Sequence, residues 1–123
     1  MNKYRDKSDF DINKAVAVNI NGTDAVLEKF GRIYISDGDR GVMVSFSPCN
    51  NPADAMPIII ENGISLINSD GVHFAAAPGC GIEGYLGGDT VGYGSRKYSE
   101  NENIYRAAME VFLMMKDAEN EKV

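Results

Sequence analysis

The most regular pattern of apolar and polar residues lies near the C-terminus of the chain. Ile104, Ala108, Val111, Phe112 and Met115 recur at the three- and four-residue spacing that is typical of one face of an α-helix. Polar residues that can cap the start of this helix stand just before it: Ser99 with Glu102, Asn101, or Asn103. We therefore predict a C-terminal amphipathic helix, with a frayed tail over residues 119–123.

Other large apolar side chains of this helix lie off the stripe. Met109, Leu113 and Met114 point to other faces, so we expect the helix to be sandwiched on two sides or to contribute to a dimer. The pattern is compatible with a monomer and with a homodimer.

Near the N-terminus, Ser8 and Asp11 have the spacing of a capping box at the start of a helix. We predict a helix from Asp9 to about Val18, preceded by a loose charged tail over residues 1–7. Val16 to Ile20 also alternates apolar and polar residues before an Asn-Gly pair, which is a competing signal for a strand entering a hairpin. The helix is the favoured interpretation.

Two β-hairpins are predicted further along the chain, because short runs of β-branched and aromatic residues flank turn residues. The first joins 32–36 to 42–46, and the second joins 64–67 to 72–77. Residues 23–30 lack clean periodicity, and we expect a short helix or a strand there.

A central helix is predicted between the hairpins. Asn51 can cap it, Pro52 suits its first position, and Asp54 falls in the first turn, near the positive end of the helix dipole. Pro57 should kink this helix or end it early, and Gly63 supplies the left-handed stop.

Together these elements predict a single α+β domain over residues 1–123. We expect one antiparallel sheet of about four strands, formed by the two hairpins and covered by the N-terminal, central and C-terminal helices. A glycine- and tyrosine-rich loop should span residues 78–98.

Charge limits the kind of partner. The net charge is −6, and no Lys or Arg occurs between Arg40 and Arg96. Because nucleic-acid binding draws most of its affinity from basic side chains, we do not expect DNA or RNA to be a partner. The acidic surface mainly serves solubility, although it also permits a basic protein partner. No apolar run approaches the roughly 20 residues of a membrane span, and the charged start lacks a secretory signal, so we expect a cytoplasmic protein without membrane contact.

Seven of the thirteen glycines cluster between Gly79 and Gly94, and residues 79–84 match the dinucleotide motif G-x-G-x-x-G. That motif requires a helix directly after it, so that the helix amino end meets the pyrophosphate. The following residues, YLGGDTVGYGS, contain four more glycines and cannot hold a helix. We therefore expect no nucleotide cofactor.

The sequence contains few of the groups used in catalysis or metal binding. His73 is the only histidine, Cys49 and Cys80 are the only cysteines, and no C-x-x-C or G-x-S-x-G motif occurs. His73 sits between Val72 and Phe74 on a predicted strand, where we expect a surface or a structural histidine. We predict a protein that is not an enzyme and has no metal site.

The composition of the glycine-rich loop favours recognition. Its rigid aromatic rings on a pliant backbone resemble those of adaptable binding loops, and Tyr and Arg often dominate binding energies. The candidate binding residues are Tyr85, Tyr93, Arg96, Lys97 and Tyr98. A functionally silent insertion is the alternative interpretation.

Three blocks of the chain resemble the NinX-like proteins of lambdoid phages, which are related to phage alpha-beta-alpha sandwich domains. They are SDFDINKAVA (8–17), CNNPADAMPIIIENGISL (49–66) and NIYRAAMEVFLMM (103–115). Met56 departs from the pattern, because the family often carries tryptophan there. The glycine-rich loop is a region where members vary.

The resemblance implies a phage or prophage accessory protein of the bacterial cytoplasm, with no catalytic residues to carry over. Asn50, Asn51, Pro52 and Asp54 match its central motif, and turn and cap chemistry explains them. We expect a non-enzymatic protein that binds a host or phage protein, for instance to blunt an antiviral defence. The alternative is a small-molecule or nucleotide-binding, sequestering protein that uses the backbone amides of the glycine-rich loop.

Overall fold

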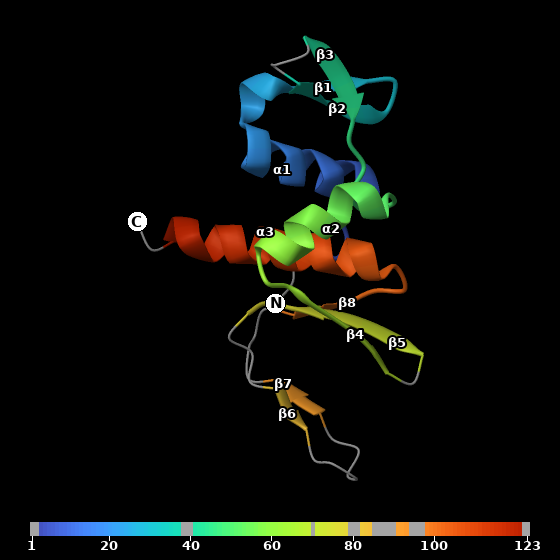
Figure 1. The fold of residues 1–123 in the computed structure, drawn as a ribbon, viewed down its shortest axis with the longest axis vertical. Helices are drawn as coiled ribbons and strands as arrows, with labels where there is room; N and C mark the ends of the chain where they lie inside the picture. Colours follow the sequence, from blue (N-terminus) through green and yellow to red (C-terminus); the bar gives the residue numbers. More distant parts are fainter. Residues whose placement is uncertain are drawn as a thin grey trace.

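The computed structural model describes residues 3–37, 41–69, 71–78, 82–84, 91–93 and 98–121. Its elements form an α+β fold with helices between sheets (Figure 1). In chain order they are α1 (Asp9–Asn21), the 3-10 helix η1 (Thr23–Ala25), β1 (Val26–Lys29), β2 (Arg32–Asp37), β3 (Val42–Ser45), α2 (Pro52–Glu61), β4 (Ser65–Ser69), β5 (Val72–Ala76), β6 (Ile82–Gly84), β7 (Val91–Tyr93), β8 (Tyr98–Glu100) and α3 (Ile104–Glu121).

Both predicted hairpins form, but the prediction that they share one sheet of four strands is wrong. The described strands make an N-terminal sheet in the order β1-β2-β3, a C-terminal sheet in the order β4-β5-β8, and a separate β6-β7 pair, and all their pairings are antiparallel. Each hairpin gains its third strand from a segment that was not assigned to the sheet. The open choice at residues 23–30 resolves as η1 followed by β1.

The physical reason for two sheets lies in α3, which is buried on every side. Residues 106–113 are all buried, because the C-terminal sheet covers one side of this helix and α1 and α2 cover the others, which leaves α1 as the surface on which the N-terminal sheet packs. α1 and α2 pack against α3, and α3 packs against β5 and β8, while α1 packs against β1 and β2. Figure 1 shows the resulting layers: sheet, α1, α3 with α2, sheet. The helices therefore lie inside, unlike the alpha-beta-alpha order that the resemblance implies.

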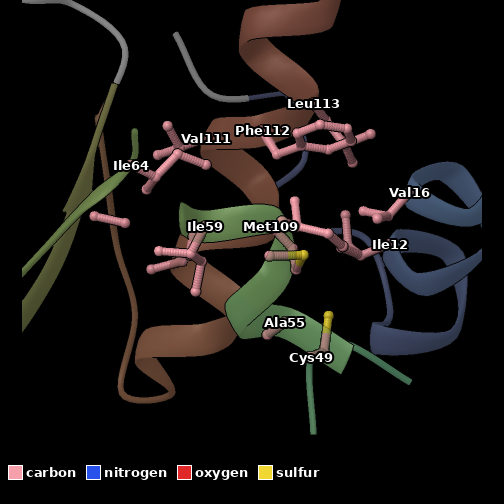
Figure 2. Close-up of a cluster of buried hydrophobic side chains, with 14 of the residues drawn as sticks. Ile12, Val16, Cys49, Ala55, Ile59, Ile64, Met109, Val111, Phe112 and Leu113 are labelled. Atoms are coloured by element: carbon pink, nitrogen blue, oxygen red, sulfur yellow. The ribbon is translucent and has the colours of Figure 1, made fainter. Parts of the chain in front are cut away.

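The core is centred on α3, as Figure 2 shows. Met109 lies between Ile12 of α1 and Ile59 of α2, and Val111 lies beside Ile64 on the side of the C-terminal sheet. Met109 and Leu113 are fully buried within the chain, so the first of the two expectations for this helix, burial between two layers, is the one observed.

The N-terminal helix begins where the capping pattern predicts. The hydroxyl of Ser8 accepts a hydrogen bond from the amide of Asp11 at 3.1 Å. The helix continues to Asn21, so the strand interpretation of residues 16–20 is wrong. Ile12, Val16 and Ala17 share a buried face, which fits the helical period.

The central helix also begins at its predicted cap, where the side chain of Asn51 accepts from the amide of Ala53 at 3.1 Å. Pro57 does not end it, since α2 continues to Glu61. Gly63 has φ +66°, and the amides of Gly63 and Ile64 donate to the carbonyls of Ile60 and Ile59. These are the two bonds of a Schellman motif, and they turn the chain so that Ile64 enters the core.

Three segments differ from the sequence interpretation. Residues 3–7 form a turn that Arg106 holds in place, rather than a loose tail: its guanidinium donates to the carbonyls of Tyr4 at 2.9 Å and Lys7 at 2.6 Å. The 78–98 segment contains β6 and β7 and the first residue of β8. α3 extends through residues 119–121, and residues 122–123 lie outside the described ranges.

Candidate interaction surface

Most of the binding residues predicted in the glycine-rich segment lie outside the described part of the structure. This holds for Tyr85, Arg96 and Lys97, and for the side chain of Tyr93, whose backbone is in β7. Tyr98 is described, in β8. It is 47% exposed, and its ring centroid lies 6.5 Å from that of Phe74 on β5. Tyr98 is therefore the only one of the five whose side chain lies in the described part of the chain, and the prediction of a shared binding site stays a prediction.

The residues of the central motif serve the local fold. A carboxylate oxygen of Asp54 accepts from the amide of Ser47 at 3.0 Å and from the side chain of Asn51 at 3.3 Å, while Asn50 donates to the hydroxyl of Ser47 at 3.3 Å. Pro52 takes the first turn of α2, where a missing amide proton costs nothing. These contacts fix the turn before α2.

Two asparagines that the sequence analysis did not single out tie that turn to the helices. Asn13 of α1 accepts from the amide of Cys49 at 2.9 Å and donates to Ser47 at 3.2 Å. Asn103 donates to the carbonyl of Cys49 at 2.6 Å and caps α3 by accepting from the amide of Tyr105 at 3.0 Å. The signal for Asn13 is its polar side chain on the apolar face of a helix.

A buried ionic cluster joins α3 to α1 and β8. Arg106 donates to Glu110 at 2.7 Å and to Asp9 at 2.6 Å, and the hydroxyl of Ser99 donates to Glu110 at 3.0 Å. Burial would lower the pKa of Arg106, but these hydrogen bonds outweigh it and raise the pKa. Among the described residues, no buried side-chain nitrogen or oxygen lacks a hydrogen-bond partner, which suits a structural role for this cluster. Its sequence signal is an oppositely charged pair four residues apart in the apolar helix.

Among the described residues, Cys49 and His73 are the side chains that were considered for catalysis or metal binding. They do not form a reactive arrangement there. Burial raises the pKa of the Cys49 thiol to about 12, so it stays protonated. His73 on β5 hydrogen-bonds to Asn68 on the neighbouring strand. Within the described ranges, no three His, Cys, Asp or Glu residues are grouped so that they could hold a metal ion.

An exposed apolar surface lies on the β1–β2 hairpin. Val26 and Ile35 face the core, so alternation turns Leu27 and its cross-strand partner Tyr34 to the opposite, outer face of the N-terminal sheet. Leu27 is exposed there. Figure 1 shows α1 on one side of this sheet only, with the sheet at one end of the molecule.

The tip of this hairpin carries an aromatic side chain in an unfavourable backbone conformation. The turn consists of Phe30 with φ +53° and Gly31 with φ +72°, the pattern of a two-residue type I′ turn. Such turns favour Asn at the first position, because a bulky residue is strained at positive φ. Phe30 is nonetheless 88% exposed, so its ring gains almost no burial within the chain.

Two basic side chains flank Phe30. Lys29 and Arg32 are directly opposite one another across β1 and β2. Like charges in this position repel each other, and neither side chain forms an ion pair with a described residue, although Lys29 lies 5.4 Å from the centroid of the Phe30 ring. We call Leu27, Lys29, Phe30 and Arg32 the hairpin surface. It is a basic, apolar patch on an acidic protein.

A groove lies at the C-terminal end of α1, between α2 and the N-terminal sheet. Its volume is about 480 Å³, and its walls come from the end of α1, from α2, from α3 and from the strand region around Ile35 and Phe46. Apolar side chains such as Ile20, Ile58 and Phe112 are combined with amides and with the charged groups of Glu61 and Lys116.

None of the described helices has the length and apolar character needed to cross a membrane. Comparison with curated proteins and with solved structures found no match. The family model described as Bacteriophage P22, NinX, matches residues 3–116, which is nearly the whole chain. The three blocks of sequence quoted above and this match agree, and the chain belongs to the NinX family of bacteriophage proteins.

Proposed function

We propose that this protein is a phage accessory protein without catalytic activity that acts in the bacterial cytoplasm by binding a host or phage protein through the hairpin surface. The exposure and the backbone strain of Phe30 are the main support for this proposal. A ring that is strained at φ +53° and exposed to 88% lowers the stability of the free chain without gaining burial. Burial against a partner explains why an aromatic occupies this position.

The charges around Phe30 indicate the chemistry of the partner. Lys29 and Arg32 face each other without a described ion-pair partner, so carboxylates on the partner would relieve their repulsion. The matching surface is therefore an apolar pocket bordered by Asp or Glu. Aromatic and Arg residues in such a setting commonly dominate interface energies.

Affinity capture from phage-infected cells tests this proposal with two variants. Phe30→Asn removes the ring and suits the turn, whereas Ile60→Ser removes another exposed apolar side chain from α2, away from the hairpin surface. We expect one protein to be recovered with the wild type and with Ile60→Ser but lost with Phe30→Asn. The purified partner should bind Phe30→Asn at least tenfold more weakly, since a hot-spot residue contributes about 2 kcal/mol or more. Equal binding by all three proteins would contradict the role of the hairpin surface.

A small-molecule-binding, sequestering role is the second candidate, and the groove supports it. Its volume of about 480 Å³ falls within the range of roughly 300–1,000 Å³ that is common for ligand pockets, and it combines an apolar lining with amides. The amides of the glycine-rich loop, which this role first invoked, belong to residues outside the described ranges. A thermal-shift screen of nucleotides and metabolites distinguishes the candidates, because a ligand at 100 times its Kd stabilises by about 2.7 kcal/mol.

A further inference from the structure

Strand β3 is exposed on both of its faces. Val42 and Val44 lie on the side of the sheet that faces the helices, and Met43 lies on the outer side, yet all three are at least 40% exposed. The strand is also the last in its sheet, because no other described strand pairs with its free edge. An apolar strand exposed in this way is a site for pairing with another strand.

The hydrogen-bond pattern shows which backbone groups are available at this edge. The amide of Phe46 donates to the carbonyl of Ile33 at 2.9 Å, so alternate residues, Val44 and Val42, also direct their backbone groups toward β2. The amides and carbonyls of Met43 and Ser45 therefore point away from β2, toward the free edge of the strand. Gly41, with φ +66°, lies directly before β3 and limits the strand at its start.

The sequence of β3 lacks the features that normally protect an edge. Natural edge strands carry Lys, Pro, inward charges or bulges. The opposite edge strand of the same sheet, β1, contains Glu28 and Lys29, but β3 has the uncharged sequence Val-Met-Val-Ser. The two edges of one sheet thus differ in protection, and β3 is the open one.

Charge indicates that a second copy of the chain can occupy this edge. The chain carries −6 overall, but residues 26–45 contain three basic residues and three acidic ones. They are Lys29, Arg32 and Arg40 against Glu28, Asp37 and Asp39. These charges sum to zero, so the repulsion that opposes the meeting of two acidic molecules is small at this sheet.

We propose that two copies of this protein pair through β3 about a two-fold axis at Val44, so that their N-terminal sheets join into one antiparallel sheet of six strands. Met43 of each copy lies opposite Ser45 of the other, and their outward amides and carbonyls form four backbone hydrogen bonds. The two Val44 side chains meet at the axis, where a non-hydrogen-bonded pair brings side chains closest. Such a self-complementary contact closes as a dimer. It places the two hairpin surfaces at opposite ends of the joined sheet, and it does not depend on the proposed partner.

Sedimentation equilibrium of the full chain over a wide range of concentration tests the dimer. We expect the wild type to reach twice the mass of one chain. Met43→Pro removes an outward amide that no described bond within the chain uses, and Pro is tolerated at such edge positions, so this variant should be monomeric while it remains folded. Met43→Lys should also be monomeric, whereas the control Ile60→Lys, at an exposed apolar position on α2, should stay dimeric. Circular dichroism and Tm confirm the folding of each variant.

A cysteine placed at the axis tests the register. In a Cys80→Ser background, Val44→Cys should form an intermolecular disulfide quickly under mild oxidation, and Ile60→Cys should not. A wild type that remains a monomer at all concentrations overturns the proposal. A dimer that survives Met43→Pro and Met43→Lys, or that fails to cross-link at residue 44, also overturns it, because the copies then meet elsewhere.

Discussion

The Nε atom of Arg106 lies 2.7 Å from a carboxylate oxygen of Glu110, one turn further along α3, and both side chains are buried. Arg106 also donates a hydrogen bond to Asp9, and the hydroxyl of Ser99 donates one to Glu110. The pair therefore links the central helix to the start of α1 and to β8. Because buried charges are tolerated only when they are paired, its members should be strongly interdependent.

Arg106→Met should destabilise the protein by roughly 3–5 kcal/mol, since it removes the guanidinium that balances the charge of the buried Glu110 carboxylate. Urea unfolding followed by circular dichroism measures the change. The double variant Arg106→Met/Glu110→Leu should recover much of the loss, because it removes both charges. Lys116→Ala, which breaks the exposed pair with Glu119, is the control and should cost no more than about 1 kcal/mol. A double variant as unstable as the single one would show that the charge of Glu110 is not the cause.

Asn103→Ala should cost roughly 1–3 kcal/mol. The asparagine caps α3 and also donates to the carbonyl of Cys49, so the change removes an N-cap and leaves a carbonyl unsatisfied. Asn19→Ala, which removes a local bond to the carbonyl of Ala15 on an exposed helix position, should have a smaller effect. Equal denaturation midpoints for the two variants would argue against a special role for Asn103.

The Cys49 thiol should be unreactive in the folded protein. In a Cys80→Ser background, iodoacetamide at pH 8 should not label Cys49 until urea is added, because burial raises its pKa to about 12. Mass spectrometry measures the labelling. Rapid labelling of the folded chain would show that this region opens readily.

The raised pKa of Cys49 also makes the free energy of unfolding depend on pH. The Cys49 pKa rises from 9.0 to about 12 on folding, so both states hold the proton below pH 9 and its contribution to stability is then complete. Between pH 9 and 12 the unfolded thiol ionises first, and this contribution is lost as pH rises. In the Cys80→Ser background, Cys49→Ala should therefore lose less unfolding free energy over this interval than its parent. Parallel curves would mean that other groups, such as Tyr4, whose pKa burial also raises, account for the alkaline loss.

Phe30→Asn should leave the fold intact and raise its stability by up to about 1 kcal/mol, because Asn tolerates positive φ and Phe does not. A higher Tm in thermal unfolding checks this. Phe30→Val serves as the control, since a β-branched residue at the same φ should give no gain. A Tm that falls in Phe30→Asn would show that the ring stabilises the free chain, for example through Lys29.

Much of the local structure could be predicted from the residues. Ser8, Asn51 and Gly63 mark helix ends through short-range chemistry, and the turn residues of both hairpins act over similar distances. Several residues before α3 could cap it according to the sequence, and the structure shows that Asn103 does so. Ser99 instead joined β8 and bonds to Glu110. That choice depends on a contact across the fold.

The candidate site was less predictable. The glycine- and tyrosine-rich loop was predicted as a binding site from its composition, whereas the residues of the hairpin surface have no unusual composition. Leu27 and Phe30 look ordinary in a sequence that predicts a covered sheet. Their exposure, and the strain at Phe30, depend on the register in which β1 pairs with β2 and on α1 covering only one face of the sheet.

The α+β class, the family, and the positions of helix starts and hairpins could be predicted from the residues alone, because capping and turn formation act between residues a few positions apart. Three features come from the packing of the whole chain: the hairpins enter two sheets on opposite sides of the helices, Arg106 and Glu110 are buried together, and β3 has an open edge among the described strands. These features depend on which surfaces meet when α3 is buried on every side, and such contacts join residues as distant as Tyr4 and Arg106.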